Sequence, residues 1–93
     1  MVMSLRVGHR RHVLAYGLNT IGRDPESTVY LNDSSVSRAH ARITIKDGQA
    51  ELEDLQSKNG TTVQNQPIDG PTMLVDGDEI EFGHVKKIGR AHV

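Results

Sequence analysis

Hydrogen-bond donors gather in three short segments of this 93-residue chain. The first segment carries Arg23, the second Ser37 and Arg38, and the third Lys58 and Asn59. Guanidinium, ammonium, hydroxyl and amide groups are the donors that suit a phosphate, which has a charge of about −1.5 to −2 and three acceptor oxygens. Arginine is the usual anchor because its fork can bind two oxygens at once. The three segments therefore predict a pocket for a phosphorylated ligand, provided that the fold brings them together.

Glycine and asparagine complete this set of residues. Gly22 and Gly60 lie beside the donors, where a residue without a side chain leaves backbone N–H groups approachable. Asn59 and Asn65 carry amides, which can donate to and accept from a peptide backbone. The ligand that fits all these groups is a phosphorylated peptide.

Short strands must position these segments, because apolar and polar residues alternate between turn residues about every ten positions. The alternation is clear in Ala41–Lys46 and again in Gln49–Leu55, and the Asp-Gly pair between them predicts a type I′ hairpin. No segment has sustained helical periodicity, and residues 34–39 are the only helix-compatible stretch. The pattern predicts an all-β fold, an antiparallel sandwich or barrel, with its loops clustered at the ends of the sheets.

The remaining elements follow from the same alternation and from turn chemistry. We expect two strands within Val2–Tyr16 joined around Gly8–Arg11, a turn at Gly17–Asn19, strands from Thr20, over Thr28–Leu31 and over Thr61–Gln64, a turn at Asn65–Pro67, a hairpin-like pair of Met73–Val75 and Glu79–Phe82, and an irregular tail from Gly83 to Val93.

Composition excludes several classes of partner. The length allows one domain, residues 1–93. A formal net charge of −1 gives no electrostatic footprint for nucleic acid or an anionic membrane, and 3% aromatic residues are too few for base stacking. No signal peptide or long apolar run occurs, so we expect an intracellular protein of the cytoplasm or nucleus.

Neither a metal site nor an active site is expected. There are five histidines and no cysteine, and His9 and His12 lie close together without any metal-binding motif around them. Ser37 and His40 are three residues apart near a strand, a spacing that would not readily place the hydroxyl on the imidazole, and no Gly-x-Ser-x-Gly elbow is present. We therefore expect a protein that is not an enzyme and that holds no metal or cofactor.

Four blocks of sequence carry a family resemblance. They are Ile21-Gly-Arg-Asp24, Val36-Ser-Arg-Ala-His-Ala41, Asp54-Leu-Gln-Ser-Lys-Asn-Gly-Thr61 and Gly77-Asp-Glu-Ile-Glu-Phe-Gly83. Each block alone is unspecific, but in this order and spacing they resemble the forkhead-associated (FHA) domain from about Leu5 to Phe82. The resemblance implies a sandwich of about eleven short antiparallel strands that binds phosphothreonine peptides through loops at one end.

The resemblance also implies a role for each donor. Arg23 corresponds to the arginine that contacts the phosphothreonine region, and Ser37 to the serine that hydrogen-bonds the phosphate. Arg38 stands where the family often has a further phosphate or peptide contact. Lys58 stands where many members have threonine or serine. Asn59 corresponds to the asparagine that holds the peptide backbone.

The other positions are expected to support these contacts. Asn65 falls in a turn that often supplies a second backbone contact. His40 resembles the family histidine, which braces the loops without touching ligand, and Gly22 and Gly60 are structural. The irregular tail departs from the family, whose last strand usually alternates clearly.

The function expected is phosphothreonine-dependent binding of a protein or peptide in signalling or regulation, by a domain that forms part of a larger protein. The alternative is an FHA-like domain that binds a protein without phosphate, through a sheet face or an exposed edge. Such a domain should lack Arg23 or Ser37, and both are present.

Overall fold

The computed structural model describes residues 2–7 and 10–92, in which every regular element is a strand. The strands are β1 (Val2–Val7), β2 (Arg10–Leu14), β3 (Gly17–Gly22), β4 (Val29–Tyr30), β5 (Ala41–Lys46), β6 (Gln49–Asp54), β7 (Thr61–Val63), β8 (Gln66–Pro67), β9 (Thr72–Leu74), β10 (Glu79–Phe82) and β11 (Val85–His92). The two-strand reading of the first sixteen residues is confirmed, although Gly8 in its predicted connection, like His9, lies outside the described residues.

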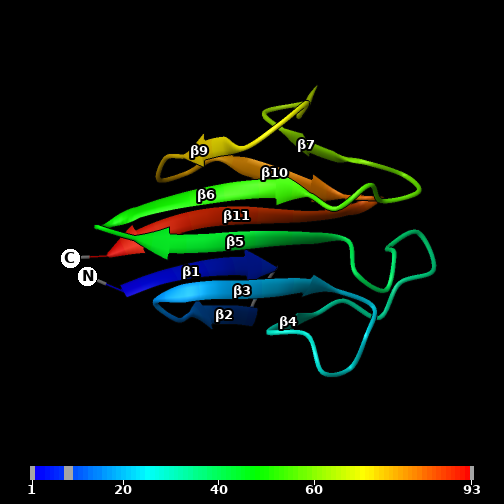
Figure 1. Cartoon of the computed structure of the whole chain (residues 1–93), viewed down its shortest axis with the longest axis horizontal. Coiled ribbons are helices and arrows are strands. Elements are labelled where there is room, and N and C mark those ends of the chain that lie inside the picture. Colours follow the sequence, from blue (N-terminus) through cyan, green and yellow to red (C-terminus); the bar gives the residue numbers. More distant parts are fainter. Residues whose placement is uncertain (1, 8–9, 93) are drawn as a thin grey trace.

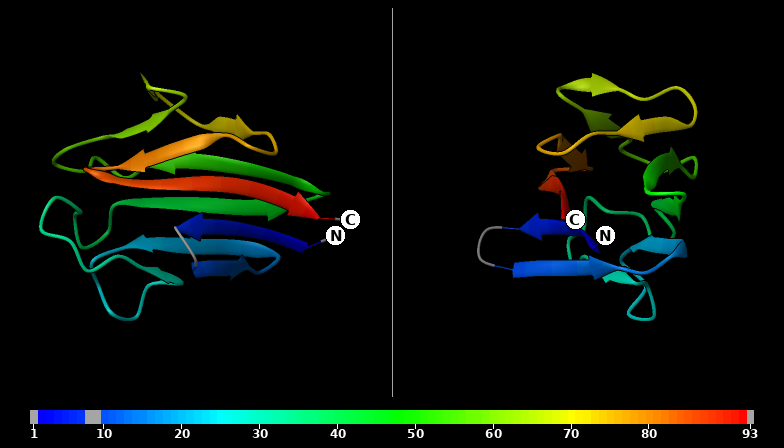
Figure 2. Two further views of the ribbon diagram at one scale, coloured as in Figure 1. Left: turned by 180° about the vertical axis from the view of Figure 1, so that it is seen from behind. Right: turned by 90° about the vertical axis from the view of Figure 1, so that its left-hand side faces the viewer.

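Two sheets form the sandwich (Figures 1 and 2). One sheet has six strands in the order β2-β1-β11-β10-β7-β8, and the other has five in the order β4-β3-β5-β6-β9. Neighbouring strands are antiparallel except for the short parallel pair β3 and β4. The predicted all-β sandwich of about eleven strands is therefore confirmed.

The core between the sheets is aliphatic, with one aromatic ring. Along β5, Ala41, Ile43 and Ile45 are buried, whereas the residues between them are not. Phe82 on β10 enters the same core from the other sheet. Full burial of such a side chain stabilises the fold by about 1.5–3 kcal/mol, so the alternating strands determine which face of each sheet is inside.

The hairpin between β5 and β6 has the predicted turn. Asp47 and Gly48 both adopt positive φ, at 53° and 76°, as a type I′ turn requires. Lys46 pairs with Gln49 directly across it. This hairpin lies at the end of the sandwich away from the loops that precede β5 (Figure 1).

The prediction of a turn at Gly17–Asn19 is wrong, because β3 begins at Gly17. Asn19 is fully buried in this strand, and its side chain closes the preceding bend by accepting from Ala15 N and donating to Ala15 O, both at 2.8 Å. Its amide also donates to Ile43 O at 3.2 Å. Asparagine marks a turn here, but the turn precedes it.

Two further expectations fail. β9 and β10 do not form a hairpin, because β9 pairs with β6 in one sheet and β10 pairs with β7 and β11 in the other. Asp78 fixes the crossing by accepting from Val75 N at 2.9 Å. The turn expected at Asn65–Pro67 lies at Gln64–Asn65 instead, with φ of 52° and 65°, and the next two residues form β8.

The predicted irregular tail is an eight-residue strand, β11, in the interior of the six-stranded sheet. Its backbone pairs with β1 on one side and β10 on the other. Pairing on both sides holds a strand whose sequence does not alternate. The helix-compatible stretch 34–39, in contrast, forms turns.

Candidate functional site

Three loops meet at the end of the sandwich opposite the β5–β6 hairpin (Figure 1). They are the β3–β4 loop (23–28), the β4–β5 loop (31–40) and the β6–β7 loop (55–60). Arg23 N donates to Ser37 O at 3.0 Å, and Lys58 N donates to Ser37 Oγ at 3.0 Å. The fold thus brings together the three donor segments singled out in the sequence.

Ser37 is the junction of the three loops. Its carbonyl accepts from the β3–β4 loop, its hydroxyl oxygen accepts from the β6–β7 loop, and its own N–H donates to His40 Nδ1 at 3.0 Å. A hydroxyl that accepts one hydrogen bond still has its proton to donate. The Ser37 hydroxyl is therefore fixed in place and available to a ligand oxygen.

Arg23 is bonded to the same loop, since its N–H donates to Ser37 O at 3.0 Å. Its Nε–H donates to Val36 O at 3.0 Å, which orients the exposed guanidinium. A guanidinium has five N–H donors, so the bond to Val36 leaves four for a ligand. The arrangement suits bidentate binding of phosphate oxygens.

Arg38 is the more loosely held arginine. Its guanidinium lies 3.8 Å from the Asp24 carboxylate, and the two side chains are 69% and 42% exposed. Exposed ion pairs of this kind contribute little stability, about 0–1 kcal/mol. A bound phosphate could therefore draw Arg38 away from Asp24 at small cost.

Lys58 and Asn59 extend the site along the β6–β7 loop. Both are exposed, and the backbone of Lys58 is anchored on Ser37 while its ammonium reaches solvent. Asn59 donates one amide hydrogen to Ser35 O at 2.8 Å. Its second amide hydrogen and its carbonyl oxygen can bind a peptide backbone.

His40 braces the loops from inside. It is fully buried, and its Nδ1 accepts from Ser37 N, so the proton resides on Nε2, which donates to Gly60 O at 2.9 Å. The imidazole also makes a T-shaped contact with Phe82, with centroids 5.9 Å apart. Both nitrogens are bonded to backbone, so the ring is not a base paired with the Ser37 hydroxyl.

A network centred on Asp54, which sequence reasoning missed, shapes the β6–β7 loop. Asp54 accepts from Ser57 Oγ at 2.6 Å, from Thr61 Oγ1 at 2.7 Å and from Ser57 N at 3.1 Å. Burial alone would raise the pKa of Asp54, but these hydrogen bonds hold it below the ordinary value. The signal was the spacing of Asp, Ser and Thr within the third sequence block.

Ser35 joins the β4–β5 loop to the turn before β11. Its hydroxyl donates to Asp33 Oδ1 at 2.6 Å and accepts from His84 N at 2.9 Å. The hydroxyl of Ser35 and, secondly, its N–H, which donates to the same oxygen at 2.9 Å, lower the pKa of Asp33. Because the Ser35 carbonyl also holds Asn59, the turn at residues 83–84 borders the site.

The two glycines affect the path of the backbone in different ways. A Cβ on Gly22 would lie 2.0 Å from Arg38 O, so only glycine lets β3 approach the β4–β5 loop. Gly60 has φ +81° and donates to Ser57 Oγ at 2.9 Å. Gly22 therefore sets the approach of β3 to the β4–β5 loop, and the N–H of Gly60 is engaged within its own loop.

Asn65 is the predicted site residue that the structure does not join to the others. It lies in the β7–β8 turn, at the far end of β7 from the β6–β7 loop, and has positive φ. In the described parts of the chain, no hydrogen bond between the three site loops involves its side chain.

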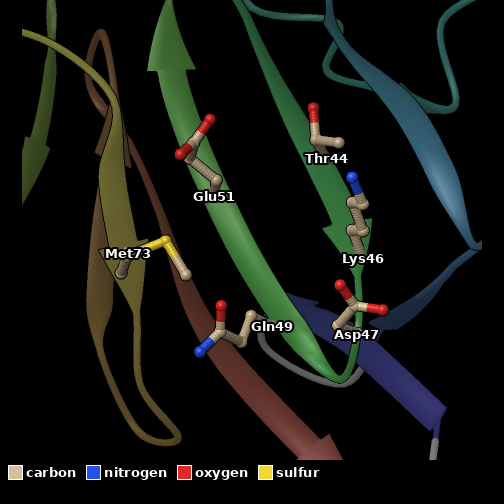
Figure 3. A pocket seen from close by; sticks show the side chains of 6 residues that line it. All are labelled: Thr44, Lys46, Asp47, Gln49, Glu51 and Met73. Carbon is tan, nitrogen blue, oxygen red and sulfur yellow. The ribbon is translucent and has the colours of Figure 1, made fainter.

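A hollow away from the three site loops lies on the outer face of β5, β6 and β9 (Figure 3). Its single cation, Lys46, lies next to Asp47 at the end of β5, while Glu51 comes from β6 and Met73 from β9. One lysine offset by two carboxylates suits a phosphate far less than the loop end does. Over residues 2–7 and 10–92, no cluster of three or more metal-ligating side chains occurs and no helix could cross a membrane.

Known proteins resemble this chain in sequence and in fold. The model of the FHA domain family matches residues 19–83. The oxoglutarate dehydrogenase inhibitor of Corynebacterium glutamicum is 40% identical over 78 residues, which are 84% of this chain and 54% of that protein. The FHA domain-containing protein FhaA of Mycobacterium tuberculosis is 43% identical over 83 residues, 89% of this chain and 16% of that protein.

A solved structure, studied for phosphothreonine-dependent FHA domain interactions, has a TM-score of 0.94 and 38% identity. The match covers 100% of this chain and 99% of that one. The chain spans about half the length of the inhibitor named above, so the similarity concerns one region of a longer relative.

Proposed function

The chain belongs to the FHA domain family, and from this premise we propose that it binds a phosphothreonine-containing protein or peptide through the loops around Ser37. FHA domains are phosphothreonine-dependent binding modules. One observation carries the assignment to these loops: the Ser37 hydroxyl is fixed by Lys58 N with its proton available, and the guanidinium of Arg23 is oriented by the carbonyl of the preceding residue, Val36.

Each donor has a distinct task in this proposal. Arg23 and Ser37 bind the phosphate oxygens, while Arg38 and Lys58 add positive charge. Asn59 holds the peptide backbone. Because the whole chain has a net charge of −1, attraction of the phosphate depends on this local cluster rather than on a global field.

The alternative is binding without phosphate, through a sheet face. On the outer face of the five-stranded sheet, a row runs from Leu18 through Thr44 and Glu51 to Met73. The two apolar ends of the row are exposed, at 58% and 47%, but polar residues separate them. Without a continuous apolar patch, this face is the weaker candidate.

The proposal extends to the setting of the domain. We propose that residues 1–93 act as one binding domain of a regulatory protein inside the cell, in the cytoplasm or nucleus. The relatives are a regulator of a metabolic enzyme and an FHA-containing protein, which supports a regulatory role and a binding module that is not an enzyme.

A peptide titration tests the proposal. Phosphorylated and unphosphorylated forms of a threonine peptide library are titrated against wild type, Arg23→Ala and Arg42→Ala. Arg23→Ala loses charge-assisted hydrogen bonds worth about 1.5–3 kcal/mol each, so its affinity for the phosphorylated peptides should be lower than that of wild type by roughly tenfold or more. Arg42 is the matched control, since it pairs with Glu53 on the outer sheet face. Equal binding of both peptide forms by wild type, or unchanged affinity of Arg23→Ala, would refute the proposal.

A further inference from the structure

A depression adjoins the phosphate-binding loops on the side of the β3–β4 loop. Its apolar floor includes the buried Ile21 and Ala41 and the half-buried Leu55, and its rim carries Asp24 and Glu26 together with Arg38. Its volume is about 160 Å³. Sites for small molecules usually hold about 300–1,000 Å³, so this hollow has room for one side chain rather than for a cofactor.

The acidic rim is held by the backbone. Asp24 N donates to Arg38 O at 3.3 Å, and Asp24 Oδ1 accepts from Glu26 N at 3.0 Å. The second carboxylate oxygen of Asp24 lies 3.8 Å from the Arg38 guanidinium. Glu26 is exposed, so its carboxylate faces solvent at the mouth of the depression.

Positive and negative charges lie side by side at this end of the molecule. The phosphate-binding loops carry Arg23, Arg38 and Lys58, and the rim of the depression shares Arg38 with them but adds Asp24 and Glu26. When a phosphate engages Arg38, Asp24 loses its partner and the depression becomes more acidic. A complementary ligand therefore has a cation next to its phosphate.

We propose that this depression is a second subsite, which takes a lysine or arginine side chain of the phosphothreonine ligand. The aliphatic stem of such a residue would cover the apolar floor, and its charged head would reach the two carboxylates. A wholly apolar side chain would cover the carboxylates without pairing them, which is costly. An acidic side chain would be repelled.

The subsite lies to one side of the phosphothreonine. Asn59 donates to the Ser35 carbonyl on one side of Ser37, whereas Arg38 pairs with Asp24 on the other. The basic residue of the ligand and the residues that Asn59 holds therefore lie on opposite sides of the phosphothreonine. This inference rests on the proposed function, because the phosphate fixes the register of the ligand.

A peptide scan against wild type, Glu26→Lys and Glu51→Lys tests the subsite. A phosphothreonine in an alanine-rich peptide is flanked by a single arginine, or a single glutamate, moved through each neighbouring position. Glu26 has no part in phosphate binding, and Glu51, exposed on the distant outer sheet face, is the matched charge reversal. At one position wild type should prefer arginine over glutamate by about two- to fivefold, the range of an exposed ion pair.

Glu26→Lys should reverse this preference at the same position, while Glu51→Lys should keep it. All three proteins should still require the phosphate. Phosphate-dependent binding with no position that favours arginine, or with the preference intact in Glu26→Lys, would overturn the subsite and leave the proposed function standing. Absence of any phosphate dependence in wild type would overturn both.

Discussion

Ser37 forms hydrogen bonds within the protein through its main chain as well as its side chain. Its carbonyl, N–H and hydroxyl oxygen connect to Arg23, His40 and Lys58, so the hydroxyl that we propose as a ligand contact is also part of the support for the loops. His40 completes the support by spanning from Ser37 N to Gly60 O. At the scale of single residues, ligand contact and loop stability are therefore coupled.

Asp54 offers a test, through pH, of how far its hydrogen bonds stabilise the β6–β7 loop. Asp54→Asn replaces an acceptor of three hydrogen bonds and should lower the free energy of unfolding at neutral pH by about 1–3 kcal/mol. The pKa of Asp54 is below 3.8 in the folded state, so its stabilising effect is present above the unfolded value and is lost as pH falls through the folded one. Urea unfolding between pH 7 and pH 2.5 measures both effects.

The difference between wild type and Asp54→Asn should be constant near neutral pH and shrink below pH 3.8. Asp69→Asn, in an exposed loop, controls for the loss of one carboxylate. A difference that persists at the lowest pH would show that packing, and not the ionised network, stabilises the loop.

At the scale of elements, the loops depend on close approach to the strands. β3 ends at Gly22, which lies against the carbonyl of Arg38. That carbonyl also accepts from Asp24 N at 3.3 Å, so it cannot move without breaking the contact between the β3–β4 and β4–β5 loops. The position of Arg38 is thus set by a glycine on another element.

Gly22→Ala should therefore impair both stability and binding. Its Cβ would meet Arg38 O at 2.0 Å, and overpacking of this kind costs about 1–3 kcal/mol. The melting temperature should fall, and affinity for a phosphothreonine peptide should fall with it as Arg38 is displaced. Gly70→Ala is the matched control, because a Cβ there meets nothing within 4 Å. A Gly22→Ala protein with wild-type melting temperature and affinity would contradict this account.

The sequence predicted most elements because alternation and turn residues are local signals. The Asp47-Gly48 hairpin and the buried face of β5 needed nothing else. The partner of a strand is not a local property, so β9 and β10 looked like a hairpin although they lie in different sheets. The donors of the site were visible by type, but the network around Asp54 depends on how the loop folds back.

At the scale of the whole molecule, the proposed binding loops and the two ends of the described chain lie at opposite ends of the sandwich. The three site loops cluster at one end, whereas the β5–β6 hairpin and the paired Val2 and His92 lie at the other (Figures 1 and 2). β11 runs between these ends in the interior of its sheet. The turn at its start borders the candidate site, so this strand connects the end of the sandwich that holds Val2 and His92 to the end that holds the three site loops.

Interior position makes β11 essential to the fold, unlike the loose tail that its sequence suggests. Every N–H of an interior strand faces a neighbour on one side or the other, and Ile88 pairs in register with Arg6 on β1 and Glu79 on β10. Ile88→Pro removes a ladder donor and should abolish cooperative unfolding, as should a chain that stops at His84. Thermal melts followed by circular dichroism, with backbone amide spectra, measure this. Proline is tolerated at an edge, as Pro67 on β8 illustrates, so an Ile88→Pro protein that melts cooperatively near the wild-type temperature would show that β11 behaves as a dispensable tail.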